Sequence, residues 1–405
     1  MNSFEKPLNP FVCSSNDALE LKLVRSPEDL EDDDASMKPE MTHQVFGDNE
    51  SIFGYRDLKV KLYYTASKLT TYLGMTYKEK IDPGRSDGIC ADDVLEKMSK
   101  TIPPGYYTNI DDFCREITKD YEFVPLGTLK KSFTINKEIS ERVFEVYVCD
   151  VLVPGYQDYH ERLQTFLLWY IDAASLIDTD DDHWRMFVVY EKYKIDGSAR
   201  YAVAGFATVY EFYAYPNNIR PRIGQMLILP PFQRHGLGSH LLECIYEYYV
   251  PMQEVVDITV EGPSDEFQRL RDFVDVRNCV KLINSQPDAL KEGYQKFCSV
   301  ISPLKLSKKQ MRRVYEILKL LFTNVKNPDE YKQYRLEVKR RLNIPYQKGQ
   351  DEYKKIQKFF NDTENNDEHS SIVPLTDEQR MENLDREYQE LENQYRQILQ
   401  RLSLL

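Results

Sequence analysis

A pair of glycines at the start of a helical pattern is the feature of this sequence that most directly suggests chemistry. Gly236 and Gly238 follow an apolar run, Gln225–Leu229, that ends at two prolines. Since proline cannot continue a strand ladder and helical apolar spacing begins at Leu241, we predict a strand, a loop and a helix. The first N–H groups of a helix have no internal partner, and glycine lets a backbone approach a ligand closely, so this loop suits a phosphate group.

The residues of the loop indicate which kind of phosphate-containing ligand it would bind. The loop has neither the Gly-Lys-Ser/Thr of a nucleotide P-loop nor the three glycines of a dinucleotide fingerprint. Gln233, Gly236 and Gly238 instead fit Gln/Arg-x-x-Gly-x-Gly/Ala, which resembles the pyrophosphate loop of acetyl-CoA-dependent N-acetyltransferases. A tight strand-to-helix turn that binds nothing is the alternative explanation of the same residues.

The elements around the loop must place it beside a substrate. We predict a long amphipathic helix, an antiparallel hairpin, a strand, the helix after the loop, a further strand and a capped helix. In chain order these are Asp158–Ile177, Arg185–Tyr193 and Arg200–Tyr213 joined at Asp196-Gly197, Gln225–Leu229, Ser239–Tyr249, Val255–Val260, and a helix from Ser264 to Val276. This order resembles the GCN5-related N-acetyltransferase (GNAT) fold, an α/β fold with a mixed sheet. In that fold two central strands splay apart, and the pantetheine amide of the cofactor takes up the exposed backbone groups; here they would be Gln225–Leu229 and Val255–Val260.

Four domains are predicted along the chain. Residues 1–136 form a mixed α/β domain with strands at 18–24 and 58–64 and a helix at 92–99, residues 137–270 form the acetyltransferase core, and residues 271–345 form a helical domain. Residues 346–405 form an extension with a flexible linker at Asn361–Ser371 and a heptad seam. The seam residues alternate spacings of three and four: Met381, Leu384, Tyr388, Leu391, Tyr395, Ile398, Leu402 and Leu405. We expect a coiled coil, formed either by self-pairing or by docking on the protein's own helices.

Composition disfavours several classes of function. A net charge of −13 over 405 residues argues against non-specific binding to nucleic acid. The seven cysteines include no C-x-x-C pair and the six histidines have no metal-type spacing, so we expect reduced thiols and no metal site. The absence of a signal peptide and of 18 consecutive apolar residues predicts a non-secreted protein without a membrane span.

Several stretches resemble the type B histone acetyltransferase catalytic subunit. They are Glu20–Arg25, Thr42–Asp48, Tyr159–Phe166, Arg220–Arg222 with Gln225–Leu229, and Arg312–Leu318. The resemblance runs from about residue 18 to 345. The tail beyond residue 345 lies outside it and resembles a fungal type of extension.

The resemblance implies an activity, a co-substrate and partners. The family transfers acetyl from acetyl-CoA to a lysine in the N-terminal tail of free, newly synthesised histone H4, in support of chromatin assembly. It works with a WD-repeat histone-binding subunit, in cytoplasm and nucleus. By motif match, the residues that would hold acetyl-CoA are Met226, Leu227, Ile228, Gln233, Arg234, His235, Gly236, Leu237, Gly238, Ser239 and Ser264.

Acidic and aromatic residues are expected along the groove for the basic histone tail. By motif match these are Asp48, Asn49, Glu50, Tyr210, Glu211 and Phe212. Acidic groups can pair with the cations of a disordered tail, and aromatic rings can stack on them. On that argument Trp184 joins the set, although a core position is an equally simple explanation of this tryptophan.

Glu261 is the predicted general base. Attack on a thioester requires a neutral amine, and with a lysine pKa near 10.4 only about one molecule in a thousand is neutral at pH 7.4, which is worth roughly 4 kcal/mol of barrier. A carboxylate at the end of the strand beside the cofactor strand can take that proton, and Glu261 lies there. It also falls on the general base of the family by motif match.

One departure from the family pattern bears on this chemistry. The family has Glu-Asp-Pro where this chain has Glu261-Gly262-Pro263, so a second acid is in doubt; Asp172 sits where relatives carry an acid and could contribute. No cysteine has a nucleophile-like context, so we favour direct attack over an acyl-enzyme. Tyr210 and Tyr246 are weak candidates to protonate the leaving thiolate.

Two other functions stay open. The same fold could acetylate protein N-termini or small amines, although members for small molecules rarely need a large N-terminal domain. The chain could also be a histone-binding assembly factor whose catalysis has faded, which Gly262 favours and the intact glycine loop opposes. A peptide-specificity assay would distinguish the first alternative from a histone acetyltransferase, and a measurement of cofactor binding would distinguish the second.

Overall fold

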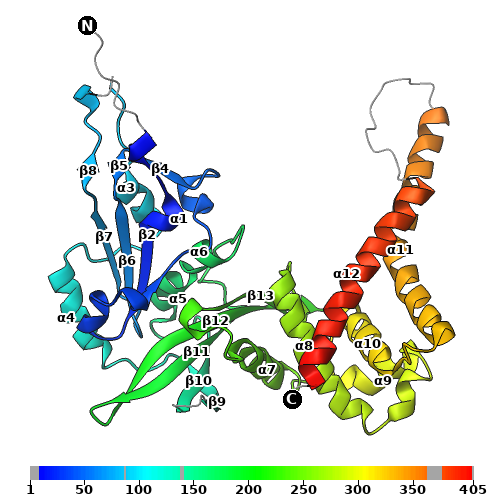
Figure 1. Ribbon diagram of the computed structural model, residues 1–405. Coiled ribbons are helices and arrows are strands. Elements are labelled where there is room, and N and C mark those ends of the chain that lie inside the picture. The colour runs from blue at the N-terminus through cyan, green and yellow to red at the C-terminus, as the bar shows by residue number, and fades with distance from the viewer. Residues whose placement is uncertain (1–8, 86–87, 137–140, 363–375, 404–405) are drawn as a thin grey trace. The chain divides into compact units, whose positions relative to one another are not determined.

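A six-stranded sheet runs through the part of the molecule that carries the predicted loop. The computed structural model describes residues 9–85, 88–136, 141–362 and 376–403 (Figure 1). The strand order is β14-β13-β12-β11-β10-β9, and every neighbouring pair is antiparallel except β13 with β14. The strands are β9 (Thr128–Asn136), β10 (Glu141–Cys149), β11 (Trp184–Ile195), β12 (Ser198–Ala214), β13 (Asn218–Ile228) and β14 (Thr259–Val260). The hairpin predicted at Asp196-Gly197 is confirmed, with φ of 50° and 79°, as a tight primed turn requires.

Helices cover both faces of this sheet. Helix α7 (Leu237–Tyr249) packs on one face, where the ring of Tyr249 lies 6.2 Å from that of Phe187 on β11. Helix α5 (Tyr156–Gln164) packs on the other face, where Tyr159 lies 6.4 Å from Tyr190 on the same strand (Figure 1). Alternate residues of β11 therefore face two different layers, as a strand buried on both sides requires.

The predicted helix Asp158–Ile177 is wrong in its second half. The chain forms α5 and a short α6 (Leu167–Tyr170), and then leaves helical geometry at Ile171, which is extended. Ala173 adopts a left-handed φ of 52°, and the side chain of Gln164 accepts the N–H of Ile177. A side chain thus satisfies a backbone group that a continued helix would have satisfied, and Asp172 lies in a turn and not in a helix.

A separate four-stranded sheet precedes the large one. Its order is β3-β2-β6-β7, and α4 packs on it through a core of Val24, Tyr63, Tyr72, Phe113 and Ile117. The two strands predicted at 18–24 and 58–64 are confirmed as β2 and β6. The elements of this region are β1 (Val12–Ser14), α1 (Ser15–Ala18), β2 (Leu19–Val24), β3 (Ser36–Met37), α2 (His43–Phe46), β4 (Ser51–Phe53), β5 (Tyr55–Arg56), β6 (Lys59–Thr65), β7 (Thr71–Thr76), β8 (Glu79–Lys80), α3 (Val94–Ser99) and α4 (Ile110–Asp120).

Residues 262–405 make a second compact unit, which is helical, while residues 1–261 make the first. The helices are α8 (Asp265–Ile283), α9 (Tyr294–Ile301), α10 (Lys308–Phe322), α11 (Pro328–Asp362) and α12 (Asp377–Ser403). Ser264 and Ser307 cap α8 and α10 by accepting backbone N–H groups, because a serine oxygen can replace the missing helical acceptor. Helix α11 continues past residue 345, the predicted end of the helical domain, and has Pro345 inside it.

The predicted heptad seam lies on α12. Its middle positions Leu384, Tyr388, Leu391, Tyr395 and Ile398 are buried, and α12 packs against α8, α10 and α11. Of the two predicted arrangements, the structure shows the docking on the protein's own helices. Self-pairing stays a prediction, and nearly all of the predicted linker Asn361–Ser371 lies outside the described residues.

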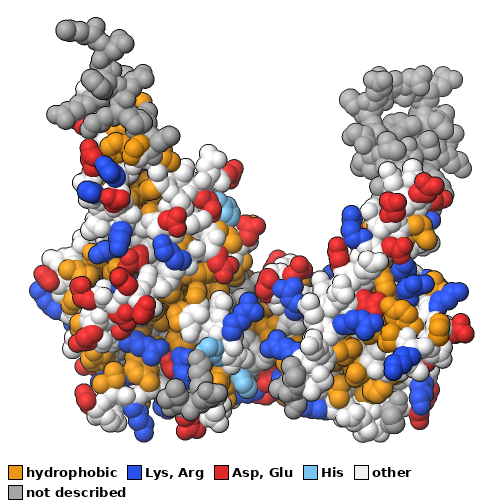
Figure 2. Space-filling model, viewed as in Figure 1, with side chains coloured by type: hydrophobic (Ala, Val, Ile, Leu, Met, Phe, Trp, Pro, Cys, Tyr) orange, Lys and Arg blue, Asp and Glu red, His pale blue; other side chains and the backbone are white. Residues whose placement is uncertain are grey.

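The surface carries mixed charge. On the face shown in Figure 2, acidic and basic side chains are interspersed over both units. The net charge of −13 is therefore not concentrated in one field on that face. Among the described helices, none is long and apolar enough to cross a membrane.

Candidate active site

Strands β13 and β14 part immediately after they meet. They pair only at Arg222 with Thr259 and Ile223 with Val260, and the N–H of Glu261 donates to the Ile223 carbonyl at 3.0 Å. Beyond Ile223 no strand among the described residues pairs with the edge of β13 that faces β14. The splay predicted from the order of elements is therefore present. Strand β14 is shorter than the predicted Val255–Val260; the earlier residues of that segment contact β13 through a bridge from Val255, a hydrogen bond from the Val256 N–H to the Ile219 carbonyl, and an ion pair of Asp257 with Arg220.

A β-bulge marks the point of divergence. Between β12 and β13 the register shifts so that Gly224 is an extra residue opposite the step from Thr208 to Val209. A Cβ on Gly224 would lie 3.3 Å from the indole ring of Trp184. The glycine thus allows an aromatic ring to lie against the strand just where its edge opens.

The loop after β13 forms a concave backbone surface. Arg234 and Gly236 both have left-handed φ, of 63° and 85°, and α7 begins at Leu237. The side chain of Gln233 turns back and donates to the Ile228 carbonyl at 2.9 Å. Alternation of left- and right-handed residues before a helix N-terminus turns successive N–H groups into one concavity, which suits a pyrophosphate.

Two arginines that sequence analysis missed support this loop. Phe232 is buried, and the guanidinium groups of Arg142 and Arg25 lie 5.3 and 5.8 Å from its ring. Both arginines bond to the buried Glu191, at 2.6 and 2.5 Å. Burial raises the pKa of Glu191, but hydrogen bonds and charge from Arg142 and Arg25 outweigh it and hold the pKa below its ordinary value. Arg25 and Glu191 are far apart in the chain, so no local pattern announces their contact.

Glu261 stands at the mouth of the splay. It follows β14 directly, is exposed, and its backbone is anchored to β13 by the bond to Ile223. The next residue, Gly262, has a left-handed φ of 41°, which glycine adopts without strain. The predicted base is thus tethered by its backbone beside the open strand edge.

Three of the predicted substrate residues form an aromatic cluster beside that edge. The ring of Tyr210 lies 4.9 Å from Trp184 and 4.5 Å from Phe212, and Arg222 lies over Phe212 at 4.5 Å. Trp184 is half-buried, so it is neither a full core residue nor a free one. Rings arranged in this way offer flat apolar surface for aliphatic stems and faces for cations.

Glu211 does not join this cluster. Its carboxylate accepts from the Tyr249 hydroxyl at 2.9 Å and pairs with Arg185 at 3.1 Å. Tyr249 is on α7, so Glu211 faces the opposite side of the sheet from its neighbours Tyr210 and Phe212. Successive residues of a strand face opposite sides of the sheet, so the sequence alone could have shown that Glu211 faces away from Tyr210 and Phe212.

The predicted substrate residues 48–50 also differ in their surroundings: one is hydrogen-bonded within the protein, and two are exposed. Glu50 accepts the N–H groups of Thr42 and His43 at 2.7 and 3.1 Å, which fixes the start of α2. Its pKa is lowered chiefly by the hydrogen bond from Thr42. Asp48 and Asn49 are exposed and remain the outward-facing members of this loop.

The turn after α6 connects α2 to the open strand. His43 Nε2 lies 3.2 Å from a carboxylate oxygen of Asp172. The side chain of Gln44 donates to the Ala174 carbonyl at 2.9 Å, and that of Gln225 on β13 donates to Ser175 at 2.8 Å. Asp172 is therefore tied to the same surface as the β13 edge.

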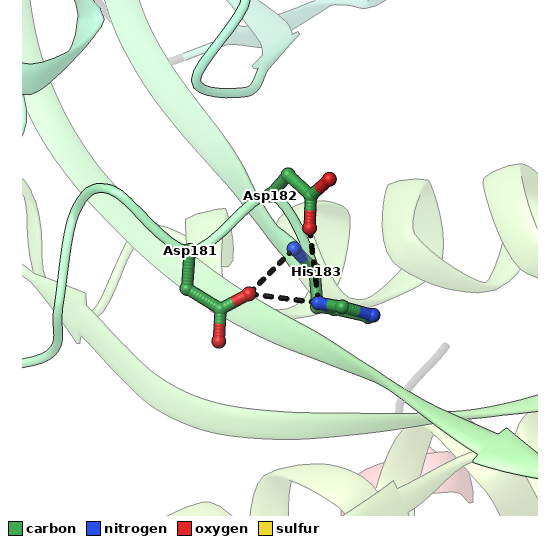
Figure 3. Close-up of side chains that lie close together, drawn as sticks. All are labelled: Asp181, Asp182 and His183. Atoms are coloured by element: carbon green, nitrogen blue, oxygen red, sulfur yellow. Dashed lines mark hydrogen bonds and ion pairs between the residues drawn. The ribbon is translucent and has the colours of Figure 1, made fainter.

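An acidic turn borders the aromatic cluster (Figure 3). Asp181 and Asp182 both approach Nδ1 of His183, at 2.8 and 3.0 Å, and His183 stacks on Tyr210 at 5.6 Å. Burial first, and then the hydrogen bond to Asp181, raise the pKa of Tyr210, so this hydroxyl is a poor proton donor to a thiolate. These acids were not among the predicted site residues, although their position just before β11 is evident from the sequence.

The remaining predicted site residues fall in two places. Met226, Leu227 and Ile228 lie on β13 beyond the point where it leaves β14, and pair with β12 on their other edge. Arg234, His235, Gly238 and Ser239 lie in the loop or at the start of α7. Tyr246 is buried on α7. Ser264 belongs to the second unit, where its hydroxyl caps α8.

Comparison with known proteins gives consistent matches along the whole chain. Three family models match: "Histone acetyl transferase HAT1 N-terminus" at residues 11–172, "Acetyltransferase (GNAT) family" at 143–263, and "Histone acetyltransferase type B catalytic subunit, C-terminal" at 271–320. Proteins named histone acetyltransferase type B catalytic subunit are similar: those of Mus musculus and Homo sapiens are 42% identical over 99% of this chain and 97% and 96% of their own length. That of Cryptococcus neoformans is 30% identical over 97% of this chain and 98% of its own. The expectation that the similarity stops near residue 345 is therefore wrong.

Proposed function

This chain belongs to the family of histone acetyltransferase type B catalytic subunits and is a GNAT acetyltransferase, and from this premise we propose that it acetylates a lysine in the N-terminal tail of free, newly synthesised histone H4. The observation that carries the proposal is the open edge of β13 leading directly into the concave loop at the start of α7. The open edge offers unpaired backbone groups for the pantetheine amides of acetyl-CoA, and the loop offers N–H groups for its pyrophosphate.

The residues fit such a ligand. Met226, Leu227 and Ile228 would bind its amides, and Gln233 to Ser239 would surround its pyrophosphate. No atom lies within 4 Å of where a Cβ on Gly236 would be, so the backbone there is open to a bulky anion.

Glu261 acts as the general base in this proposal. It removes a proton from the lysine ammonium, directly or through one water. The neutral nitrogen then attacks the thioester carbonyl; the new C–N bond forms, the C–S bond breaks, and the CoA thiolate takes up a proton. Because a thiol is a good leaving group with a pKa near 8.5, this last step needs little help.

The aromatic cluster and the exposed acids would hold the histone tail. Trp184, Tyr210 and Phe212 would stack on lysine and arginine stems, while Asp48 and Asn49 would meet the cations or backbone of the tail. Glu50 and Glu211 would act through the loop and sheet they stabilise. The same premise supports a WD-repeat histone-binding subunit as partner, a presence in cytoplasm and nucleus, and a role in chromatin assembly.

The first test compares initial rates of acetyl transfer from acetyl-CoA to an H4 tail peptide by wild type and Glu261→Gln. We expect a loss of about a hundredfold or more in kcat, because positioned proton transfer contributes at least that factor. Glu254→Gln is the matched control, since Glu254 is another exposed glutamate close to β14. A small primary amine, offered at equal concentration, tests the alternative substrate class.

Each outcome decides between stated alternatives. An active wild type with an unimpaired Glu261→Gln moves the base to Asp172 or a water chain, and Asp172→Asn then tests that position. A wild type that binds acetyl-CoA and peptide without turnover favours the histone-binding assembly factor. A faster reaction with the small amine than with the peptide would contradict the proposed substrate.

A further inference from the structure

A second pocket lies in the first unit and shares no residue with the candidate active site. Its volume is about 310 Å³. One face of α5 lines it, because Gly155, Tyr159 and Arg162 are spaced four and three residues apart and so lie above one another on the helix. Tyr107 and Glu116 are on the opposite wall. A pocket of this size accommodates a small molecule or one or two side chains of a peptide.

Arg162 is a half-buried cation with spare donors. Its Nε donates to the Lys68 carbonyl at 3.2 Å. In the described part of the chain its two terminal nitrogens have no hydrogen-bond acceptor, and no carboxylate lies within ion-pair distance. Burial lowers the pKa of this guanidinium from its ordinary value. A desolvated guanidinium with a free fork is the side chain best shaped to take a carboxylate with two parallel hydrogen bonds.

An aromatic wall lies beside Arg162. The ring of Tyr159 lines the pocket, while its hydroxyl is shielded from solvent and lies beside Tyr190. Phe123 stacks on the Tyr159 ring at 5.9 Å, so the two rings give this part of the pocket a flat apolar surface.

The local charge favours a singly charged anion. Glu116 is neutralised by Lys119 at 2.6 Å, and Lys68 Nζ donates to the Lys119 carbonyl at 2.6 Å while lining the pocket. Gly155 caps α5, so the positive end of that helix also borders the pocket. A polyphosphate would meet Glu116, whereas a carboxylate on an apolar stem matches both the charge and the aromatic wall.

We propose that this pocket binds a carboxylate carried on an aromatic or apolar body. Arg162 holds the carboxylate through its fork, and the body lies along the rings of Tyr159 and Phe123. The carboxylate belongs either to a free aromatic acid or to the C-terminus of a peptide that ends in an aromatic residue. This proposal is independent of the acetyl transfer proposed above.

The test uses the full chain with saturating CoA, so that the cofactor site is filled. Binding of 4-fluorobenzoate is followed by fluorine NMR. We expect Arg162→Gln to weaken binding about tenfold or more, as for a hydrogen bond to a charged group. Arg115→Gln is the matched control: it removes an exposed guanidinium of α4 that does not line the pocket, so binding stays unchanged.

Further variants and probes keep the result decisive. Arg162→Lys retains the charge without the fork and should bind with intermediate affinity; wild-type affinity would overturn the role of the fork. 4-Fluorobenzamide should not compete, and tighter competition by N-acetylphenylalanine than by benzoate would identify a peptide C-terminus as the source. No binding by wild type at about 10 mM, which is weaker than any specific site needs to be, or displacement by CoA would overturn the proposal.

Discussion

Two carboxylates, one in each unit of this protein, have opposite surroundings. In the helical unit Glu316 is 1% exposed and accepts from Arg341 at 2.7 and 2.8 Å, from Arg312 at 3.2 Å and from Tyr395 at 3.0 Å. In the first unit Glu261 is exposed at a strand end, and among the described residues only its backbone is hydrogen-bonded. The carboxylate of Glu316 accepts four hydrogen bonds, whereas that of Glu261 accepts none from the part of the chain that the structure describes.

The difference follows from what each group has to do. A buried charge is tolerated only if it is paired and hydrogen-bonded, so Glu316 joins residues of α10, α11 and α12 at one point. A general base must accept a proton during the reaction, which a saturated carboxylate cannot do. The residue type alone does not distinguish Glu316 from Glu261, because the hydrogen-bond partners of each carboxylate determine what it can do.

The largest expected effect comes from removing the saturated carboxylate. Glu316→Gln leaves Arg341 without its buried partner, and breaking a buried pair costs about 3–5 kcal/mol. We expect the urea midpoint of the far-UV circular dichroism signal to fall markedly, and hydrogen exchange in α10 and α11 to accelerate. Glu261→Gln, the same chemical change at an exposed site, should leave both unchanged, and an equal loss of stability in the two variants would refute the comparison.

Acid should act on the first unit before it acts on the second. His160 is fully buried on α5, and burial lowers its pKa to about 4 from an ordinary value of 6.5. The unfolded chain therefore binds the extra proton first, so this stability is complete above about pH 6.5 and is lost progressively as the pH falls towards 4, by about 3 kcal/mol.

The helical unit should resist this range of pH. Burial raises the pKa of Glu392, but hydrogen bonds from Tyr331, Tyr388 and Arg396 outweigh it and lower the pKa below 4.5, so its contribution is lost only at lower pH. His160→Gln should flatten the pH dependence of unfolding between pH 6.5 and 4. Early loss of α12 signal on acidification would contradict this order.

The smallest expected effect separates backbone strain from ligand binding. Gly236 and Gly197 have φ of 85° and 79°, and both have open space at the Cβ position. Alanine at either site should cost about 1–2 kcal/mol, because a left-handed conformation strains an L-residue. Only Gly236→Ala should raise KM for acetyl-CoA, by a few-fold, and an equal change in Gly197→Ala would show that the loop has no special role.

Local chemistry made much of this structure predictable. The prolines after Leu229, the glycines of the loop and the serine at 264 determine structure only in their immediate neighbourhood, so the end of β13, the loop and the start of α8 lie where they were predicted. Strand β13 itself begins earlier than predicted, at Asn218, and α7 begins at Leu237. The path after Tyr170 was not predictable in this way. Its apolar spacing suits a helix, but a side chain from Gln164 and contacts to Gln225 compete for the same backbone.

The sequence by itself determined the family, the strand-loop-helix unit and the residue that can serve as base, because these depend on residue types at short spacing. Only the tertiary structure decided which acids are free. Glu50, Glu211 and Glu316 are bonded by partners that come from other elements, and Glu261 is not, within the residues described. It also decided that α12 docks on its own unit, since an apolar seam fits any matching surface and only the folded chain supplies one at high local concentration.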